Sequence, residues 1–132
     1  MSSVLQRIGI SLILILYLFS GIGKLFDFNN TVEKIYQKKM FNIFPRIISV
    51  ISIIITILLL TIGSIILIYS HFSKESILIK NIAVYINIAL ILFTILVTFL
   101  FHFPDSKPQI IHFLKNTSII GGLLLSLDSL LR

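Results

Sequence analysis

The chain has 132 residues, of which 57% are hydrophobic and only 12% are charged, with a net charge of +6 and no cysteine. A soluble domain is about half apolar and about a quarter charged, so a soluble fold of this length could not bury so much apolar surface. The absence of cysteine excludes disulfides, thiol redox chemistry and thiolate metal sites within the chain. The positive charge does not indicate nucleic-acid binding, because the cations fall in loops and at helix ends, where they would meet lipid headgroups.

Four apolar stretches alternate with short polar connections, and each approaches the roughly 20 residues that cross about 30 Å of hydrocarbon. Backbone groups in lipid must be satisfied within the chain, so each stretch is predicted to be a helix. The predicted helices cover about 8–26, 46–69, 82–101 and 108–131. The sequence therefore predicts an all-α fold, in which one domain over residues 1–132 forms an integral membrane four-helix transmembrane bundle.

The first apolar stretch has some features of a secretory signal peptide. Arg7 precedes an apolar core that reaches the small residues Ser20 and Gly21. However, apolar residues continue to Phe26 and no A-x-A cleavage pattern follows. These observations favour an uncleaved transmembrane helix.

Two connections on one side of the membrane have local structural signals. The longer one, 27–44, includes a segment over 31–40 for which two alternatives stay open, a short amphipathic surface helix and a solvated loop. Before the last helix, Ser106 and Gln109 have the spacing of a capping box, and Pro108 falls in the first turn.

Small and polar residues recur at helical spacing in all four helices. Because helices in lipid associate through such residues, we expect them to form the contacts of a compact bundle rather than a permeation path. The stripes comprise Tyr17, Ser20, Gly21 and Lys24; Ser49, Ser52, Thr56, Gly63 and Ser64; Ala83, Asn87, Thr94 and Thr98; and Ser118, Gly122 and Ser126, with Thr117 and Gly121 beside them. The predicted helix-packing positions are Gly21, Gly23, Gly63, Ser118, Gly121 and Gly122.

A polar cluster is expected at one membrane face, where the first and third helices end and the second and fourth begin. Such residues are costly at a helix mouth in lipid and therefore mark a candidate site. Lys115 lies eight residues beyond Lys107, or about 12 Å along a helix, and Lys24 is spaced to pair with Asp27. The candidate ligand residues are Lys24, Asp27, His102, His112, Lys115 and Asn116, with Arg46 and Gln109 nearby.

Several interpretations of this cluster stay open. The cations and histidines could simply anchor the protein at the interface by snorkelling, or they could bind a quinone, a lipid headgroup or another amphipathic ligand. A haem or metal held by His102 and His112 is less favoured, since two histidines are too few for a closed zinc site and His71 lies on the opposite side. No metal site and no hydrolytic triad are predicted.

Three motifs resemble the DoxX family of small four-helix membrane proteins. Residues 19–28, FSGIGKLFDF, resemble the family pattern sGxxKlxdf, and Phe101-His-Phe resembles the family's histidine at the end of the third helix. Residues 109–125, QIIHFLKNTSIIGGLLL, resemble its q…flKNlailGGlLl stretch. The resemblance implies a four-helix bundle similar to subunits of membrane oxidoreductase systems, including a thiosulfate:quinone oxidoreductase.

The second helix departs from the family pattern. Relatives often have a glutamate just before the glycines, whereas residues 57–63 read ILLLTIG without an acid. We therefore expect an accessory or non-catalytic component of a redox-related, quinone-linked membrane complex, with no catalytic residue assigned. The alternatives are a membrane enzyme or binding protein with its own quinone or lipid headgroup site, and a small transporter or cargo adaptor.

The expected partners are the lipid bilayer and membrane or peripheral oxidoreductase subunits, with homo-oligomers also open. Quinone is the cofactor that the resemblance suggests, although the sequence itself requires none. Lysine and arginine are more numerous on the side of the polar cluster, so positive-inside reasoning places that side in the cytoplasm and both termini outside. The host membrane is not indicated.

Overall fold

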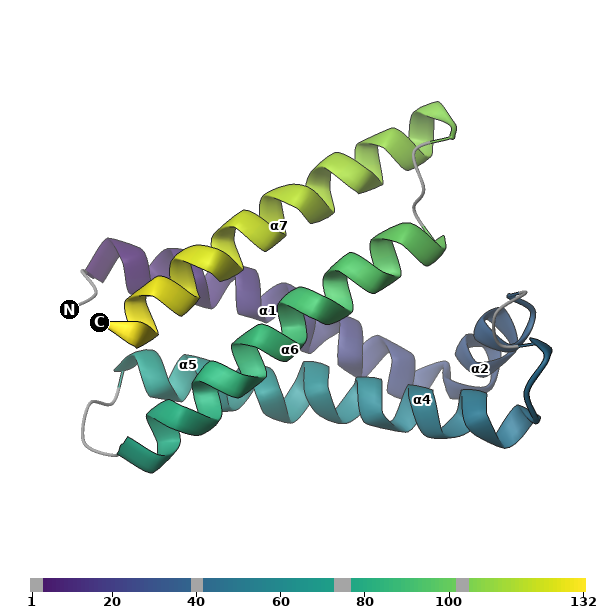
Figure 1. Ribbon diagram of the computed structural model, residues 1–132, viewed down its shortest axis with the longest axis horizontal. Coiled ribbons are helices and arrows are strands. Elements are labelled where there is room, and N and C mark those ends of the chain that lie inside the picture. Colours follow the sequence, from purple (N-terminus) through teal and green to yellow (C-terminus); the bar gives the residue numbers. More distant parts are fainter. Residues whose placement is uncertain (1–3, 39–41, 73–76, 102–104) are drawn as a thin grey trace.

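A computed structural model describes residues 4–38, 42–72, 77–101 and 105–132, and every regular element in this part is helical (Figure 1). The π-helical turn η1 joins α4 to α5, so that residues 46–72 form one long helix. The elements are α1 (Val4–Phe26), α2 (Phe28–Tyr36), α4 (Arg46–Leu58), η1 (Leu59–Gly63), α5 (Ser64–Phe72), α6 (Ile77–Phe101) and α7 (Lys107–Leu131).

Four of these helical stretches are long and apolar enough to cross a membrane, namely Val4–Phe26, Arg46–Phe72, Ile77–Leu100 and Lys107–Leu131. They contain the four predicted helices almost completely and extend each of them at one end. Both chain ends lie at the same end of the bundle (Figure 1), as an even number of crossings requires. The predicted all-α transmembrane four-helix bundle is thereby confirmed.

The bundle has a leucine-rich core, and its outer surface exposes many large apolar side chains, which suits contact with lipid. Leu14, Leu60, Leu67 and Leu90 are fully buried and belong to one cluster contributed by α1, η1, α5, α6 and α7. Helix α1 packs against α2, α4, η1, α5 and α7.

The third predicted stripe lies wholly inside the bundle. Ala83, Asn87, Thr94 and Thr98 are all buried along one face of α6. Close packing also occurs at Gly21, where an added Cβ would lie 2.7 Å from Thr61 Cγ2. Small residues at these positions therefore allow the helix backbones to approach, as is common in membranes.

Only some of the other predicted packing positions lie between helices. An added Cβ would meet nothing within 4 Å at Gly23 or Gly121, whereas at Gly122 it would collide with Ile13. Ser118 is exposed, and its hydroxyl donates to the Leu114 carbonyl of its own helix at 3.0 Å. The stripe is therefore used at Gly122, where α7 approaches Ile13 of α1, and not one turn earlier.

The bundle is open at the end where α7 begins. Helix α7 packs mainly on α6, and α6 packs on α5 and η1, whereas α4 packs on α1 and α2. In Figure 1 the pair α6 and α7 rises away from α4 and α2 towards this end.

The long connection contains helix α2 over Phe28–Tyr36, so the helix alternative holds for residues 31–36 of the predicted segment, and the helix begins three residues earlier. Val32 is 2% exposed and packs in a cluster with Ile53 and Ile57 of α4. Glu33 forms an ion pair with Arg46, which also ties α2 to the start of α4. Helix α2 is thus fixed beside the open end of the bundle.

The start of α7 follows the sequence signals only in part. Ser106 occupies the N-cap position and Pro108 lies in the first turn, as predicted. The Ser106 side chain makes no capping hydrogen bond, so its half of the predicted capping box is wrong. Its carbonyl instead accepts from the Ile110 amide at 2.9 Å, as it would in any helix.

Candidate functional site

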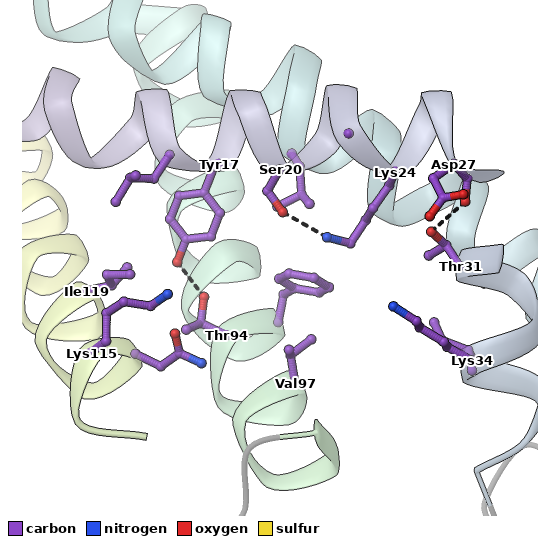
Figure 2. A pocket seen from close by; sticks show the side chains of 16 residues that line it. Tyr17, Ser20, Lys24, Asp27, Thr31, Lys34, Thr94, Val97, Lys115 and Ile119 are labelled. Atoms are coloured by element: carbon purple, nitrogen blue, oxygen red, sulfur yellow. Dashed lines mark hydrogen bonds between the residues drawn. The ribbon is translucent and has the colours of Figure 1, made fainter. Parts of the chain in front are cut away.

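A cavity of about 650 Å³ lies at the open end of the bundle, between α1 and α2 on one side and α6 and α7 on the other (Figure 2). Ligand pockets typically have volumes of about 300 to 1,000 Å³. Its polar lining residues are Tyr17, Ser20, Lys24, Asp27, Thr31, Lys34, Thr94, Lys115 and Asn116.

Three lysines from three different helices reach this cavity. Lys24 belongs to α1, Lys34 to α2 and Lys115 to α7, and Figure 2 shows their side chains extending towards the same space. Snorkelling lysines, by contrast, direct their ammonium groups outwards to the interface. Lys24 is partly buried, whereas Lys34 and Lys115 are exposed at the rim of the cavity.

The Lys24 ammonium donates to Ser20 Oγ at 2.8 Å, one turn earlier in α1. An ammonium group has three protons to donate, so this bond leaves two for a ligand. Lys34 and Lys115 have no ion-pair or hydrogen-bond partner among the residues that the structure describes. All three lysines thus retain donors that can serve a ligand in the cavity.

Side chains that form hydrogen bonds between helices line the inner part of the cavity. The Tyr17 hydroxyl lies 2.5 Å from Thr94 Oγ1, and that threonine hydroxyl already donates to the Leu90 carbonyl at 2.8 Å. Tyr17 must therefore be the donor to Thr94, since a threonine hydroxyl has a single proton. Asn116 Nδ2 donates to Thr98 Oγ1 at 3.1 Å and holds α7 against α6.

Apolar side chains line the remaining wall. They come from α1, α2, η1, α6 and α7 and surround the polar groups. These residues are Leu16, Ile35, Leu60, Phe93, Val97 and Ile119. The cavity therefore offers cationic and hydroxyl donors beside an apolar surface, a combination that suits an amphiphilic molecule.

The π-helical turn contributes to this wall through Leu60. Within it, Thr61 Oγ1 donates to the Ile57 carbonyl at 2.6 Å. Single π-turns are rare and often occur at functional sites. This turn lies in the segment 57–63, where the sequence departs from the DoxX pattern.

The structure brings together four of the predicted site residues. Lys24, Asp27, Lys115 and Asn116 all line the cavity, whereas His112 is exposed and is not among the described lining residues. His102 lies outside the described residues.

The pairing of Lys24 with Asp27 that the spacing suggests is absent in this part of the chain. Lys24 bonds to Ser20, and Asp27 Oδ1 accepts a hydrogen bond from Asn30 Nδ2 at 2.9 Å. Arg46, another member of the predicted cluster, is engaged by Glu33. Lys24 and Asp27 thus each bond to a nearby residue, Ser20 and Asn30, instead of to each other.

Sequence reasoning did not place Lys34, a residue of the long connection 27–44, among the candidate ligand residues. A signal was present, because Asp27, Thr31 and Lys34 are spaced by four and three residues and so share one face of a helix. In the structure all three line the cavity.

A second polar group lies at the opposite end of the bundle. His71, Asn87 and Ser126 are each less than 5% exposed, and no described cavity reaches them. His71 Nε2 and Asn87 Nδ2 lie 2.8 Å and 2.6 Å from Ser126 Oγ. This buried group connects α5, α6 and α7 through hydrogen bonds, as expected for residues that hold helices together.

No group of three or more histidine, cysteine, aspartate or glutamate side chains gathers in the part of the chain that the structure describes. Asp27 is the one carboxylate among the described lining residues of the cavity.

Comparison of the chain with models of known protein families, with curated proteins and with solved structures found no match. The resemblance to the DoxX family therefore stays a prediction based on the three sequence motifs.

Proposed function

We propose that this protein is a membrane-embedded binding protein that holds the polar headgroup of an amphiphilic ligand in the cavity between α1, α2, α6 and α7. The observation that carries the proposal is the meeting of Lys24, Lys34 and Lys115 in one cavity that also has hydroxyl groups and an apolar wall.

The charged and polar groups match a headgroup that accepts hydrogen bonds. The three lysines can only donate, and lysine ammonium groups are strong donors to carbonyl, carboxylate and phosphate oxygens. A ligand headgroup placed here would replace the water that these cations otherwise need. Ionisable residues in membrane helices commonly mark such binding sites.

The apolar wall matches the rest of an amphiphile. Val97 and Ile119 face the cavity from α6 and α7 (Figure 2), and the outer surfaces of the same helices expose residues such as Leu96 and Leu124. A ligand tail could therefore run from the cavity to the lipid without leaving apolar surroundings.

An accessory role in a quinone-linked complex, which the sequence motifs suggest, stays a prediction. A quinone headgroup would satisfy the same donors through its carbonyl oxygens, so such a role is compatible with the cavity. Catalysis is not part of this proposal.

The test is to fill the cavity. Val97→Trp would place an indole ring in the cavity, and Leu96→Trp is the matched control, since residue 96 lies next in the same helix, is 51% exposed and does not line the cavity. Each purified protein would be mixed in mild detergent with a membrane lipid extract and a short-tailed quinone, and native mass spectrometry would record bound molecules.

We expect the wild-type protein and Leu96→Trp to retain one amphiphile per chain and Val97→Trp to lose it, while circular dichroism shows equal helix content. Retention of the same molecule by Val97→Trp, or the absence of any bound amphiphile from the wild-type protein, would contradict the proposal.

A further inference from the structure

We infer that the headgroup bound in this cavity is an anion of the phosphate-ester class rather than a neutral headgroup. The inference rests on the proposed function and specifies the ligand of the same site. It is carried by the balance of charge around the cavity.

The described lining of the cavity has an excess of two positive charges. Lys24, Lys34 and Lys115 contribute three ammonium groups, and Asp27 contributes the single carboxylate. Asp27 is itself exposed and already accepts a hydrogen bond from Asn30. Its charge therefore compensates only part of the positive charge.

The positive charges of the three lysines are not neutralised by ion pairs with acidic side chains in the described part of the chain. The charges of Lys24 and Lys34 repel each other, and no described acidic side chain forms an ion pair with any of the three lysines. Charge interactions are stronger beside an apolar wall than in water, because the local dielectric constant is lower. A ligand that supplies negative charge would remove this repulsion, whereas a quinone would leave it in place.

The number and placement of donors favour a phosphate over a carboxylate. The three lysines approach from three helices (Figure 2), and a tetrahedral phosphate ester presents oxygens in several directions, whereas a carboxylate presents two in one plane. A phosphate monoester also carries about 1.5 to 2 negative charges near neutral pH, which is close to the excess at this site.

The experiment compares two lipids that differ only by the phosphate. Phosphatidic acid and diacylglycerol with the same acyl chains would be titrated separately into the full-length protein in mild detergent, with binding read by native mass spectrometry. A short-tailed quinone tests the neutral alternative, and inorganic phosphate added as a competitor tests whether the anion alone suffices.

The matched variants are Lys24→Gln, Lys34→Gln and Lys115→Gln, with Lys80→Gln as the control. Residue 80 lies in α6 near its start, is exposed and does not line the cavity, so the control removes the same charge elsewhere. We expect phosphatidic acid to bind at least about tenfold more tightly than diacylglycerol. Each cavity variant should lose about tenfold of this affinity, and Lys80→Gln should keep it.

The outcomes separate this inference from the proposed function. Displacement of phosphatidic acid by inorganic phosphate would support the anion and identify the phosphate group as sufficient, whereas resistance to it would support a lipid-borne phosphate. Equal binding of the two lipids, or tight binding of the quinone alone, would overturn the anionic ligand and leave the amphiphile site standing. If no probe binds and Val97→Trp changes nothing, both proposals fail.

Discussion

The Ser126 hydroxyl of α7 lies 2.8 Å from Nε2 of His71, the penultimate residue of α5, and accepts a hydrogen bond of 2.6 Å from the Asn87 side chain of α6. One serine therefore connects three helices inside the bundle. The serine oxygen can accept a second hydrogen bond or donate its own proton, so the direction of its bond with His71 depends on the histidine tautomer. Asn87 Oδ1, by contrast, has no hydrogen-bond partner among the described residues.

Ser126→Ala should lower the free energy of unfolding by about 1 to 2 kcal/mol, because it leaves the buried His71 and Asn87 side chains without this partner. Unfolding by sodium dodecyl sulfate in mixed micelles, followed by circular dichroism, would measure the change. Ser118→Ala in the same helix is the control, since that exposed hydroxyl bonds only to Leu114. Its effect should stay below about 0.5 kcal/mol, and equal effects of the two variants would contradict the role assigned to Ser126.

Two glycines in α1 should respond differently to the same substitution. Gly21→Ala would place its Cβ 2.7 Å from Thr61 Cγ2 and 3.0 Å from Leu60 Cβ, so α1 and η1 would have to separate. We expect a loss of about 1 to 3 kcal/mol in the free energy of unfolding. Thermal unfolding in detergent would measure it.

Gly23→Ala is the matched control, because its Cβ would meet nothing within 4 Å. Alanine is the better helix former, so this variant should be neutral or more stable by up to about 1 kcal/mol. If Gly21→Ala were as stable as Gly23→Ala, α1 and η1 could not be packed as closely as the structure has them.

The position of α2 should depend more on apolar packing than on its ion pair. Val32→Ala removes two methyl groups from a side chain that is 2% exposed, which should cost about 1 to 2 kcal/mol. Hydrogen exchange measured by mass spectrometry should accelerate in residues 28–36 and much less in α6. Glu33→Gln, which weakens a pair with side chains 39% and 56% exposed, should have less effect; a larger effect would reverse this ranking.

Orientation can be tested because the chain has no cysteine of its own. The excess of lysine and arginine near α2 and the start of α7 predicts that this side faces the cytoplasm. A membrane-impermeant maleimide applied to intact cells should therefore label Arg132→Cys but not Gln37→Cys or Asp105→Cys. The opposite labelling pattern would place the cavity end of the bundle outside.

The transmembrane helices could be predicted from the sequence because lipid imposes a simple requirement. A stretch of about 20 apolar residues must satisfy its own backbone, and only a helix does so within one segment. The inward face of α6 could be predicted for the same reason, since Asn87, Thr94 and Thr98 recur at helical spacing among apolar residues and are all buried. The bounds of the helices differ mainly at their ends, where α6 begins at Ile77 rather than near residue 82.

The packing of α7 was not predictable in this way. Small residues occupy two rows of this helix, and either row could contact a neighbour. The direction in which α7 leaves the bundle decides that Gly122 and Ser126 are used while Gly121 and Ser118 are not.

For the candidate site, the sequence by itself determined that Lys24, Asp27, Lys115 and Asn116 lie near one membrane face, because the number of crossings fixes which helix ends share a side. Only the tertiary structure decided that Lys34 joins them and that His112 does not line the cavity with them. The physical reason is that a membrane face is fixed by helix count, whereas a cavity depends on the rotation of each helix and the angle between helix pairs. Those are set by contacts between distant residues, such as Val32 with the α4 cluster and Gly21 with Thr61.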